Sequence, residues 1–559
     1  MLFSRASCAS IGTGRWYLLG NGRGAYQSDT SGGEPSMSLN LAEVFFQKAA
    51  AQPEHPLILG PRGGSCISYG EFQRDVQSMA ERLREAGISK GMNVGLHYPS
   101  DQKYILFTYA LWTVGASVTP IPMELANEEK QQILQHIAID TLISSVRHCD
   151  VFEDFIVGDA SELSEQARLL KVKTQRQAPA ELAAINPAFI RFTSGTTGTA
   201  KGVVLSHETI FERINAANQG LHIGPEDRIV WLLSMAYHFT VSIVAYLSFG
   251  ATIVLPKNAF GVSLLRAAID NNATMIYGAP THYELMTHDR SDKALPPLRL
   301  AIVTTARLST ELAEAFYQRF GLALNETYGI IEIGLPVINI DQPRQKQGSV
   351  GQLLPAYSIK LVRQENQNTS EILLHGPGLL DAYYEPWMRR EAILQKHSGW
   401  LATGDLGVMD DAGFLTIVGR SKEMISVAGM KFFPQEVERV LERHPDIQAA
   451  CVFGVKVPRL GESPMAHLVL NEGCDAPDEN ALKDHCAELL ASYKIPREFK
   501  WVLCLERTAS GKIVRNADKL LKTGQTLNTA NPINTNQKLN TDKLKTNVGE
   551  QHDLTTSAT

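Results

Sequence analysis

The chain has 559 residues, of which 44% are hydrophobic and 20% are charged, a composition typical of a folded globular protein and unlike that of a disordered or fibrous one. A formal net charge of −6, without a long basic run, argues against nucleic-acid binding over the whole chain. The length exceeds that of one ordinary hydrophobic core, so we expect two or more domains.

Both ends of the chain differ from the sequence between them. Three arginines, Arg5, Arg15 and Arg23, precede the first acidic residue. This is the charge bias of an organelle transit peptide, and a non-native start upstream of Met37 explains it equally well. We expect residues 1–37 to be a disordered or non-native extension. We also expect 522–559, rich in Asn, Thr, Gln and Lys, to be a disordered polar tail.

From about residue 38 onward, helical and strand patterns alternate. The segment "SYGEFQRDVQSMAERLREAG" opens with a capping box of Ser68 and Glu71 and stops at Gly87, so a helix is predicted over it. A strand is predicted directly after it at 93–98, and further strand and helix patterns recur over 298–329. This alternation predicts parallel sheets covered by helices.

Two apolar stretches, 104–123 and 229–256, contain no Lys, Arg, Asp or Glu and are long enough to cross a membrane. The first contains glycine and two prolines, and the second contains a histidine and several hydroxyl residues. Each is better interpreted as a buried helix followed by a buried strand. We therefore expect no membrane span.

After about residue 419 the pattern changes to that of a smaller α+β unit. Strands are predicted at 447–455, 465–471 and 499–505, with a helix over 479–493. A unit of this size is typical of a separate domain.

Seven scattered cysteines have no C-x-x-C spacing. They argue against a disulfide framework and against a structural zinc site. We therefore expect a cytoplasmic protein in a reducing compartment.

The segment "RFTSGTTGTAKGVVLSH" at 191–207 is rich in Gly, Thr and Ser and contains one lysine. It departs from the nucleotide-hydrolase loop G-x-x-x-x-G-K-[ST], because Ala200 replaces the second glycine and Gly202 replaces the Mg²⁺-binding hydroxyl residue. Small residues, hydroxyls and a lysine nevertheless suit an anion. A polar turn without a ligand is the alternative.

Five separated segments together resemble the acyl-adenylate-forming superfamily, which includes acyl-CoA synthetases, aryl-CoA ligases, peptide-synthetase adenylation domains and luciferases. They are "TSGTTGTAKG" at 193, "NETYGIIEIG" at 325, "TGDLG" at 403, "GRSKEMISVAGMKFFPQEVE" at 419 and "SGKIVR" at 510. The resemblance covers roughly 38–521. It implies an α/β fold in which a large N-terminal domain, 38–419, with helix-covered, mainly parallel sheets precedes a small mobile C-terminal α+β lid, 420–521.

The resemblance also implies an activity. A carboxylic acid would be activated with ATP and Mg²⁺ to acyl-AMP and then transferred to a thiol, either that of CoA or the phosphopantetheine of an acyl carrier protein. One alternative is an enzyme that passes acyl-AMP to another acceptor, with aminoacyl-AMP as a subtype. Another is a non-catalytic acyl- or nucleotide-binding relative.

Roles for residues of the large domain follow from the same resemblance. Glu332 would bind Mg²⁺, Tyr328 would stack on adenine, Asp405 would accept hydrogen bonds from the ribose, and Arg420 would reach the same region. The β- and γ-phosphates would be held by a loop and a catalytic lysine: Thr193, Ser194, Gly195, Thr196, Thr197, Gly198 and Lys201.

Three positions of the small domain and one of the large domain match moving or gating parts of the family. Lys512 would bridge the acid carboxylate and the α-phosphate. Lys422 would be the hinge, and Gly429 would leave room for the pantetheine arm. His238 would gate the acid, with a satisfied core histidine as the alternative.

The sequence departs from the family in two places near the predicted site. Ile331 stands where family members usually have Thr or Ser beside the α-phosphate, so one donor is absent. The turn "TTARLS" replaces a glycine- and alanine-rich one, with Thr304 near the glycine position.

The acid is predicted to be fatty or aryl. Thr240 stands where peptide-synthetase domains place the Asp that pairs with an α-ammonium group, so an amino acid is disfavoured. Apolar residues are the candidates to line the acyl pocket: Phe239, Val241, Ile333, Leu335 and Val337.

Overall fold

The computed structural model describes residues 38–60, 66–173, 176–193, 201–363, 369–457, 461–508 and 513–521. The predicted disordered ends, 1–37 and 522–559, lie outside the described residues. The domain boundary predicted at 419–420 and the mobility of the lid stay predictions.

The first nine-stranded sheet has the order β16-β15-β14-β13-β12-β10-β11-β1-β2. Its centre is parallel, and every residue of the strands β12 (Met275–Gly278) and β13 (Leu300–Val303) is buried. Continuous apolar runs of this kind are expected where helices cover both faces of a parallel sheet. The remaining strands are β1 (Pro56–Leu59), β2 (Cys66–Ser68), β10 (Arg228–Trp231), β11 (Thr252–Val254), β14 (Asn325–Ile330), β15 (Gly334–Ile338) and β16 (Gln352–Leu353).

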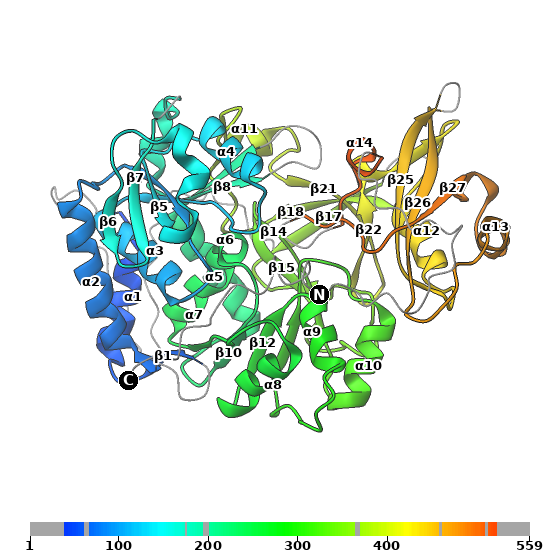
Figure 1. Cartoon of the computed structure of the whole chain (residues 1–559), viewed down its shortest axis with the longest axis horizontal. Coiled ribbons are helices and arrows are strands. Elements are labelled where there is room, and N and C mark those ends of the chain that lie inside the picture. Colours follow the sequence, from blue (N-terminus) through cyan, green and yellow to red (C-terminus); the bar gives the residue numbers. More distant parts are fainter. Residues whose placement is uncertain are drawn as a thin grey trace, which may run out of the picture. The chain divides into compact units, whose positions relative to one another are not determined.

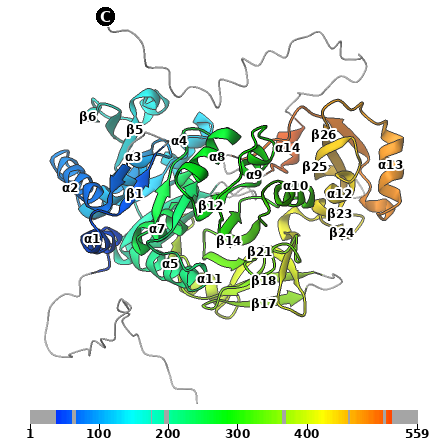
Figure 2. The same ribbon diagram turned by 90° about the horizontal axis from the view of Figure 1, so that it is seen from below.

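Helices alternate with these strands as the sequence predicts. Figures 1 and 2 show α8 (Gly261–Asp270), α9 (Pro280–Thr287) and α10 (Thr310–Phe320) beside the strands that they connect. Each begins after one parallel strand and leads into the next, which is the usual crossover connection.

The second nine-stranded sheet has the order β20-β19-β9-β8-β4-β3-β5-β7-β6. Its parallel centre consists of β3 (Asn93–His97), β4 (Ser117–Pro120), β5 (Thr141–Ser145) and β8 (Pro187–Thr193). Antiparallel strands flank this centre: β6 (Ser161–Ser164), β7 (Ala167–Lys171), β9 (Lys201–Ser206), β19 (Ala382–Tyr383) and β20 (Met388–Arg389). The large sheets are therefore mixed, with parallel centres and antiparallel edges.

The helix α3 (Gln102–Val114) packs on β3 and β4 of this second sheet, and α2 (Tyr69–Glu85) packs on α3 and on β1 and β2 of the first sheet. The capping box predicted from Ser68 and Glu71 is formed. The stretch 104–123 is the predicted buried helix α3 followed by the buried strand β4.

The second apolar stretch, 229–256, corrects the prediction of a helix followed by a strand. It begins with most of β10 and continues through the short helices α6 (Met235–His238), η4 (Phe239–Val241) and α7 (Ile243–Phe249) into β11. Its first residues form a strand because β10 lies between two parallel neighbours, and burial on both faces requires an unbroken apolar run. Within the described residues, no helix is long and apolar enough to cross a membrane.

A four-stranded antiparallel sheet follows, in the order β17-β18-β21-β22. Its strands are β17 (Ser358–Arg363), β18 (Ser370–His375), β21 (Leu401–Met409) and β22 (Leu415–Arg420). The sequence interpretation did not include this sheet. Most of β17 is exposed or half-buried, which is possible because an antiparallel sheet can leave one face in water.

The C-terminal part has the predicted α+β composition. Its sheet, β24-β23-β26-β25 with β27 beside β26, packs its own hydrophobic core against α12 (Pro434–Leu441) and α13 (Glu479–Ala487). The other elements are β23 (Ile425–Val427), β24 (Met430–Phe432), β25 (Ile447–Val457), β26 (Gly461–Leu470), β27 (Glu498–Trp501) and α14 (Ala517–Leu520).

The turn after β13 contains a strained threonine. Thr305 has φ of 74°, a left-handed conformation that costs a β-branched residue roughly 1–2 kcal/mol. We predict that Thr305→Gly will raise the free energy of unfolding by about 1 kcal/mol, because glycine adopts this conformation without a Cβ clash. Urea denaturation measures the change.

Thr304→Gly is the matched control for this prediction. The Thr304 side chain interacts with Tyr277 and partly opposes the rise in its pKa, so glycine there should lower the free energy of unfolding by about 1 kcal/mol. Equal destabilisation by both substitutions would contradict strain at Thr305.

Candidate functional site

Side chains from four neighbouring parallel strands gather at the carboxyl edge of the first large sheet. β10 ends at Trp231, β12 ends beyond Tyr277, β13 leads into Thr304, and β14 carries Tyr328. Binding sites of open α/β sheets form at this edge, outside the carboxyl ends of the strands. The edge is therefore the candidate site.

The buried carboxylate of Asp405 joins the other two predicted nucleoside-binding residues, Tyr328 and Arg420. The Tyr328 hydroxyl donates to Asp405 Oδ2 at 2.7 Å, and Arg420 Nε donates to Asp405 Oδ1 at 2.8 Å. Asp405 is only 3% exposed, and it is paired with Arg420 across β21 and β22. Burial, followed by the Asp405 charge, raises the pKa of Tyr328. The tyrosine therefore stays a neutral donor, and a nucleotide would meet an already ordered aromatic and ionic group.

Tyr383 connects the predicted magnesium ligand with the predicted phosphate lysine. Its hydroxyl donates to Glu332 Oε1 at 3.3 Å, and Lys201 Nζ lies 4.3 Å from the centroid of its ring. Burial, with the Glu332 charge, raises the pKa of Tyr383. The sequence interpretation missed Tyr383.

Lys201 and Tyr383 also line a cavity of about 170 Å³. Lys396 and His397 line the same cavity, so groups that can carry positive charge face it. Five apolar side chains belong to the same lining: Pro386, Met388, Ile393, Leu401 and Ala402. The cavity is therefore mainly apolar, with Lys201 in one part of its wall.

Glu332 fits a magnesium ion that arrives with a nucleotide. Among the described residues, no three His, Cys, Asp or Glu side chains are grouped to hold a metal. Mg²⁺ commonly uses one or two carboxylates, with substrate phosphates and water completing its six ligands. Glu332, joined through Tyr383 to the predicted phosphate lysine Lys201, is compatible with that requirement.

A buried arginine that the sequence interpretation missed holds the segment before Glu332. Arg213 lies on α5 (His207–Leu221) and is 1% exposed. Its guanidinium donates to the Ile331 carbonyl at 3.0 Å and to the Gly378 carbonyl at 2.6 and 3.1 Å. Burial lowers its pKa to about 10, so it stays charged at neutral pH. The only sequence signal was an arginine on the apolar face of a helix.

An aromatic group lies next to the predicted gate. The His238 ring centroid is 6.2 Å from that of Tyr277 and 6.3 Å from that of Trp231, and the last two rings stack at 5.5 Å. Burial raises the pKa of Tyr277 to about 12. Trp231 and Tyr277 are thus the aromatic side chains beside His238, and both are buried in the same hydrophobic core cluster as Phe239.

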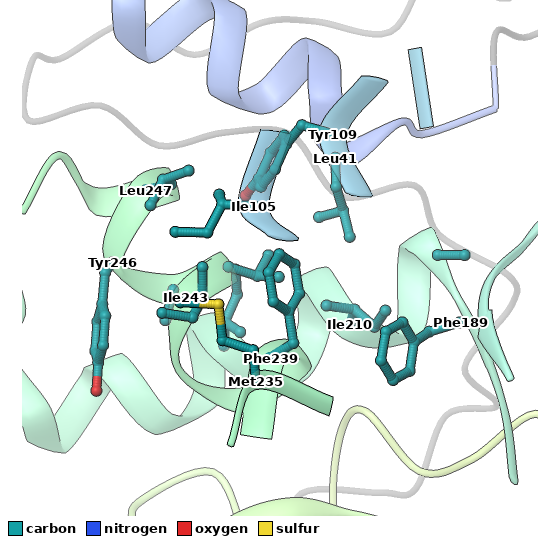
Figure 3. Packing of buried hydrophobic residues seen from close by; sticks show 14 of the residues in the cluster. Leu41, Ile105, Tyr109, Phe189, Ile210, Met235, Phe239, Ile243, Tyr246 and Leu247 are labelled. Atoms are coloured by element: carbon teal, nitrogen blue, oxygen red, sulfur yellow. The ribbon is translucent and has the colours of Figure 1, made fainter. Parts of the chain in front are cut away.

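Most of the apolar residues predicted to line the pocket belong instead to the hydrophobic core. Phe239 is fully buried and stacks on Phe189 (Figure 3). Three others are also buried there: Ile333, Leu335 and Val337. Val241 is half-buried. The sequence could not distinguish a pocket wall from the core, because both require apolar side chains.

Comparison with known proteins decides the family. The model of the AMP-binding enzyme family matches residues 45–384, and the model of its C-terminal domain matches 436–512. The chain belongs to the AMP-binding enzyme family.

Two relatives and one solved structure illustrate the similarity of this AMP-binding enzyme. Sulfoacetate–CoA ligase of Cupriavidus necator is 29% identical, over 86% of this chain and 98% of the relative. Feruloyl-CoA synthase of an Amycolatopsis species is 27% identical, over 81% and 93%. The O-succinylbenzoate CoA synthetase of Bacillus subtilis, in complex with ATP and a magnesium ion, has a TM-score of 0.72 at 25% identity, over 85% and 99%.

These matches confirm the predicted family, the α/β fold with a smaller C-terminal domain, and the class of acid–thiol ligase that forms an acyl-adenylate. They do not assign roles to individual residues of this AMP-binding enzyme. The predicted roles of Lys201, His238, Tyr328, Glu332, Asp405 and Arg420 therefore stay predictions.

Several predicted residues of this AMP-binding enzyme lie outside the described residues. They include Lys512 and the phosphate-loop residues Ser194, Gly195, Thr196, Thr197 and Gly198. Thr193 is the last residue of β8, and it is paired with Lys201 at the start of β9. The two described ends of the loop are thus adjacent in the sheet.

The predicted hinge and pantetheine positions are exposed. Lys422 lies in a short 3₁₀ helix, Ser421–Glu423, directly after β22. Gly429 has φ of 85° in the turn between β23 and β24, and a Cβ added there would have no heavy atom within 4 Å. The predicted role of Gly429 thus meets no obstruction from its described surroundings.

Proposed function

We propose that this enzyme activates a carboxylic acid with ATP and Mg²⁺ to an acyl-adenylate and transfers the acyl group to the thiol of CoA. The observation that supports this most strongly is that β14 and the turn after it carry one residue of each of two groups, Tyr328 and Glu332. Asp405 with Tyr328 and Arg420 is suited to a nucleoside, and Glu332 with Tyr383 and Lys201 is suited to phosphates and a metal. The names of the relatives, a sulfoacetate–CoA ligase and a feruloyl-CoA synthase, support CoA as the acceptor.

In the first half-reaction an oxygen of the acid carboxylate attacks the α-phosphorus of ATP, and pyrophosphate leaves. Lys201 and the hydroxyls of the preceding loop would hold the pyrophosphate charge, which grows in the transition state. Glu332 would hold Mg²⁺, which neutralises phosphate charge when bound. Arg213 fixes the backbone before Glu332, so the carboxylate would be positioned before substrate arrives.

In the second half-reaction the thiol displaces AMP from the acyl-adenylate. We propose that rotation about Lys422 withdraws Lys512 and presents the turn that contains Gly429 to the pantetheine arm. Carrier-protein phosphopantetheine is the alternative acceptor. A cytoplasmic location remains part of the proposal, and the described cysteines, which are free thiols, fit a reducing compartment.

The acid is proposed to lack an α-ammonium group and to place its carbon skeleton against Trp231 and Tyr277. A fatty or aryl acid fits this description. Thr240 is only 1% exposed and carries no charge, so an ammonium group beside it would be buried without a partner.

We predict that Thr240→Asp will impair use of the native acid and lower the free energy of unfolding by about 2 kcal/mol, because a buried carboxylate loses its hydration. Thr240→Asn introduces a side chain of similar shape to aspartate but without its charge. It should have a smaller effect on both turnover and the free energy of unfolding. Steady-state pyrophosphate release and urea denaturation measure the two quantities. Faster turnover of the native acid by the aspartate variant would contradict a non-amino substrate.

A pyrophosphate-release screen tests the proposed function. Fatty, aryl, dicarboxylic and amino acids are each supplied with MgATP and with CoA, with holo carrier protein, or with neither. Acid-dependent release that CoA accelerates is the expected result. Release that needs no thiol would favour an enzyme that passes acyl-AMP to another acceptor. Release that the carrier protein accelerates would favour its phosphopantetheine as the acceptor, and no acid-dependent release would favour a binding protein.

A further inference from the structure

Arg191 is a partly buried cation at the junction of the two halves of the candidate site. It lies on β8, two residues before Thr193, and is paired with Val203, which is also the partner of Tyr383. Its face of the sheet therefore carries Tyr383 as well, because residues directly opposite each other in a ladder point to the same side. Its guanidinium also reaches the short helix α6, which ends at His238.

The contacts of Arg191 leave part of its hydrogen-bonding capacity unused. One terminal nitrogen donates to the Tyr237 carbonyl at 2.7 Å, and the guanidinium carbon lies 4.9 Å from the centroid of the Tyr237 ring. The Nε atom is buried and has no hydrogen-bond partner. A guanidinium has five donors in a fixed fork, so an acceptor is missing on the side of Nε.

The charge of Arg191 also lacks a close partner. Arg299, Arg390 and Arg420 each form an ion pair with an aspartate. Arg191 forms no ion pair with any described residue. Burial lowers the pKa of Arg191, and the neighbouring Tyr237 and the Glu332 carboxylate partly oppose that shift. If Glu332 binds Mg²⁺, its charge is taken up by the metal, and the guanidinium needs an anion from elsewhere.

A second unpartnered polar group lies within electrostatic reach of Arg191. Tyr104, on α3, is 1% exposed, and its buried hydroxyl has no hydrogen-bond partner. Its ring lies 5.7 Å from that of Phe239, the residue after His238. Burial raises the pKa of Tyr104, so the hydroxyl is a neutral donor. Arg191 and Tyr104 are among several buried polar groups without a partner, and a ligand beside them could supply the acceptor that each lacks.

We propose that Arg191 and Tyr104 form a subsite that binds a second anionic group, a carboxylate or a sulfonate, on the acid that this enzyme activates. This inference rests on the proposed function and narrows the substrate to a dianionic acid, whose carbon skeleton lies against the aromatic side chains near His238.

The acid is a better source of this anion than the triphosphate of ATP. Both described contacts of Arg191 are made with Tyr237, and Tyr104 packs on Phe239. Tyr237 and Phe239 flank His238, the predicted acid gate. The predicted phosphate donors Thr193 and Lys201 lie instead at the end of β8 and the start of β9.

Matched pairs of acids test the subsite: succinate with butyrate, 3-sulfopropionate with butyrate, and terephthalate with 4-methylbenzoate. The measurement is kcat/KM from pyrophosphate release at saturating MgATP. The wild-type enzyme should prefer the dianionic member of at least one pair. Arg191→Gln should lower kcat/KM for that acid by about tenfold to a hundredfold, the range for hydrogen bonds to a charged group. Its monoanionic partner should change by about twofold or less.

Further variants separate binding from folding. Arg191→Lys keeps the charge but not the fork and should recover part of the preference. Tyr104→Phe removes only the hydroxyl and should lower the preference. Tyr109→Phe is the matched control, because Tyr109 is also buried on α3, packs on Phe239 and has an unpartnered hydroxyl, but the Arg191 charge affects the pKa of Tyr104 and not that of Tyr109. It should leave the preference unchanged.

Three results would overturn the proposal. They are a wild-type preference for the monoanionic acids, an equal loss for both members of a pair in Arg191→Gln, and a raised KM for MgATP as the main effect of that variant. If no acid drives pyrophosphate release, the proposed function itself fails. If only acids outside these pairs drive pyrophosphate release, the affinities of the paired acids are measured by calorimetric titration in the presence of a non-hydrolysable ATP analogue. Equal affinity within every pair would overturn the subsite.

Discussion

Replacing Lys512 with alanine is expected to slow acyl-adenylate formation by about 10²-fold or more, because a preorganised charge is lost from a desolvated site. Thioester formation from supplied acyl-adenylate should stay nearly intact, since the proposed rotation removes Lys512 from the site before the thiol enters. Rapid-quench measurement of each half-reaction, with purified acyl-adenylate for the second, gives both rates.

Gly429→Trp should show the reverse pattern. The indole would fill the space of the pantetheine arm and slow thioester formation, while the ATP site is untouched. Gly429→Ala is the control, because both substitutions impose the same strain at φ of 85° but only tryptophan is bulky. Equal slowing of both half-reactions by Lys512→Ala and by Gly429→Trp would contradict a rotating domain and favour one fixed geometry.

Arg213→Met is expected to lower the free energy of unfolding by about 4 kcal/mol, because two buried carbonyl groups lose their donors. The side chain that is lost is 1% exposed and holds Ile331 and Gly378. Adenylation should fall by about tenfold or more at temperatures where the variant is folded, since Glu332 follows Ile331 directly and its position would loosen. Urea denaturation and single-turnover pyrophosphate release measure the two effects.

Arg213→Lys serves as the control for this substitution. Lysine keeps the charge, but it cannot reach two carbonyls with a planar fork, so intermediate losses are expected. A methionine variant that is less stable yet adenylates at the wild-type rate would show that Arg213 stabilises the fold without positioning Glu332.

The alternating parts of the fold could be predicted because their signals are local. The capping box of Ser68 and Glu71 marks the start of α2, and the apolar runs of β12 and β13 identify buried parallel strands. The antiparallel sheet β17-β18-β21-β22 could not be predicted in the same way. Its strands are partly exposed, and β18 pairs with β21 only after an intervening segment that contains α11 (Arg390–Gln395).

Only those residues of the candidate site that belong to sequence motifs could be predicted. Asp405, Tyr328 and Arg420 were identified from separate segments, and the structure brings them together. Tyr383 and Arg213 were missed, because each acts through a contact made by folding alone. Tyr383 is 51 residues from Glu332 along the chain, and Arg213 is 118 from Ile331. No local pattern identifies such partners.

The most direct test of the central proposal is rapid-quench analysis with α-labelled ATP and an acid found active in the pyrophosphate screen. Without CoA, acyl-AMP should accumulate to about one equivalent per enzyme. Adding CoA should convert that label to AMP at a rate no slower than steady-state turnover, with the acyl group recovered as its thioester. Thioester formation without a prior, kinetically competent acyl-AMP would contradict the proposal.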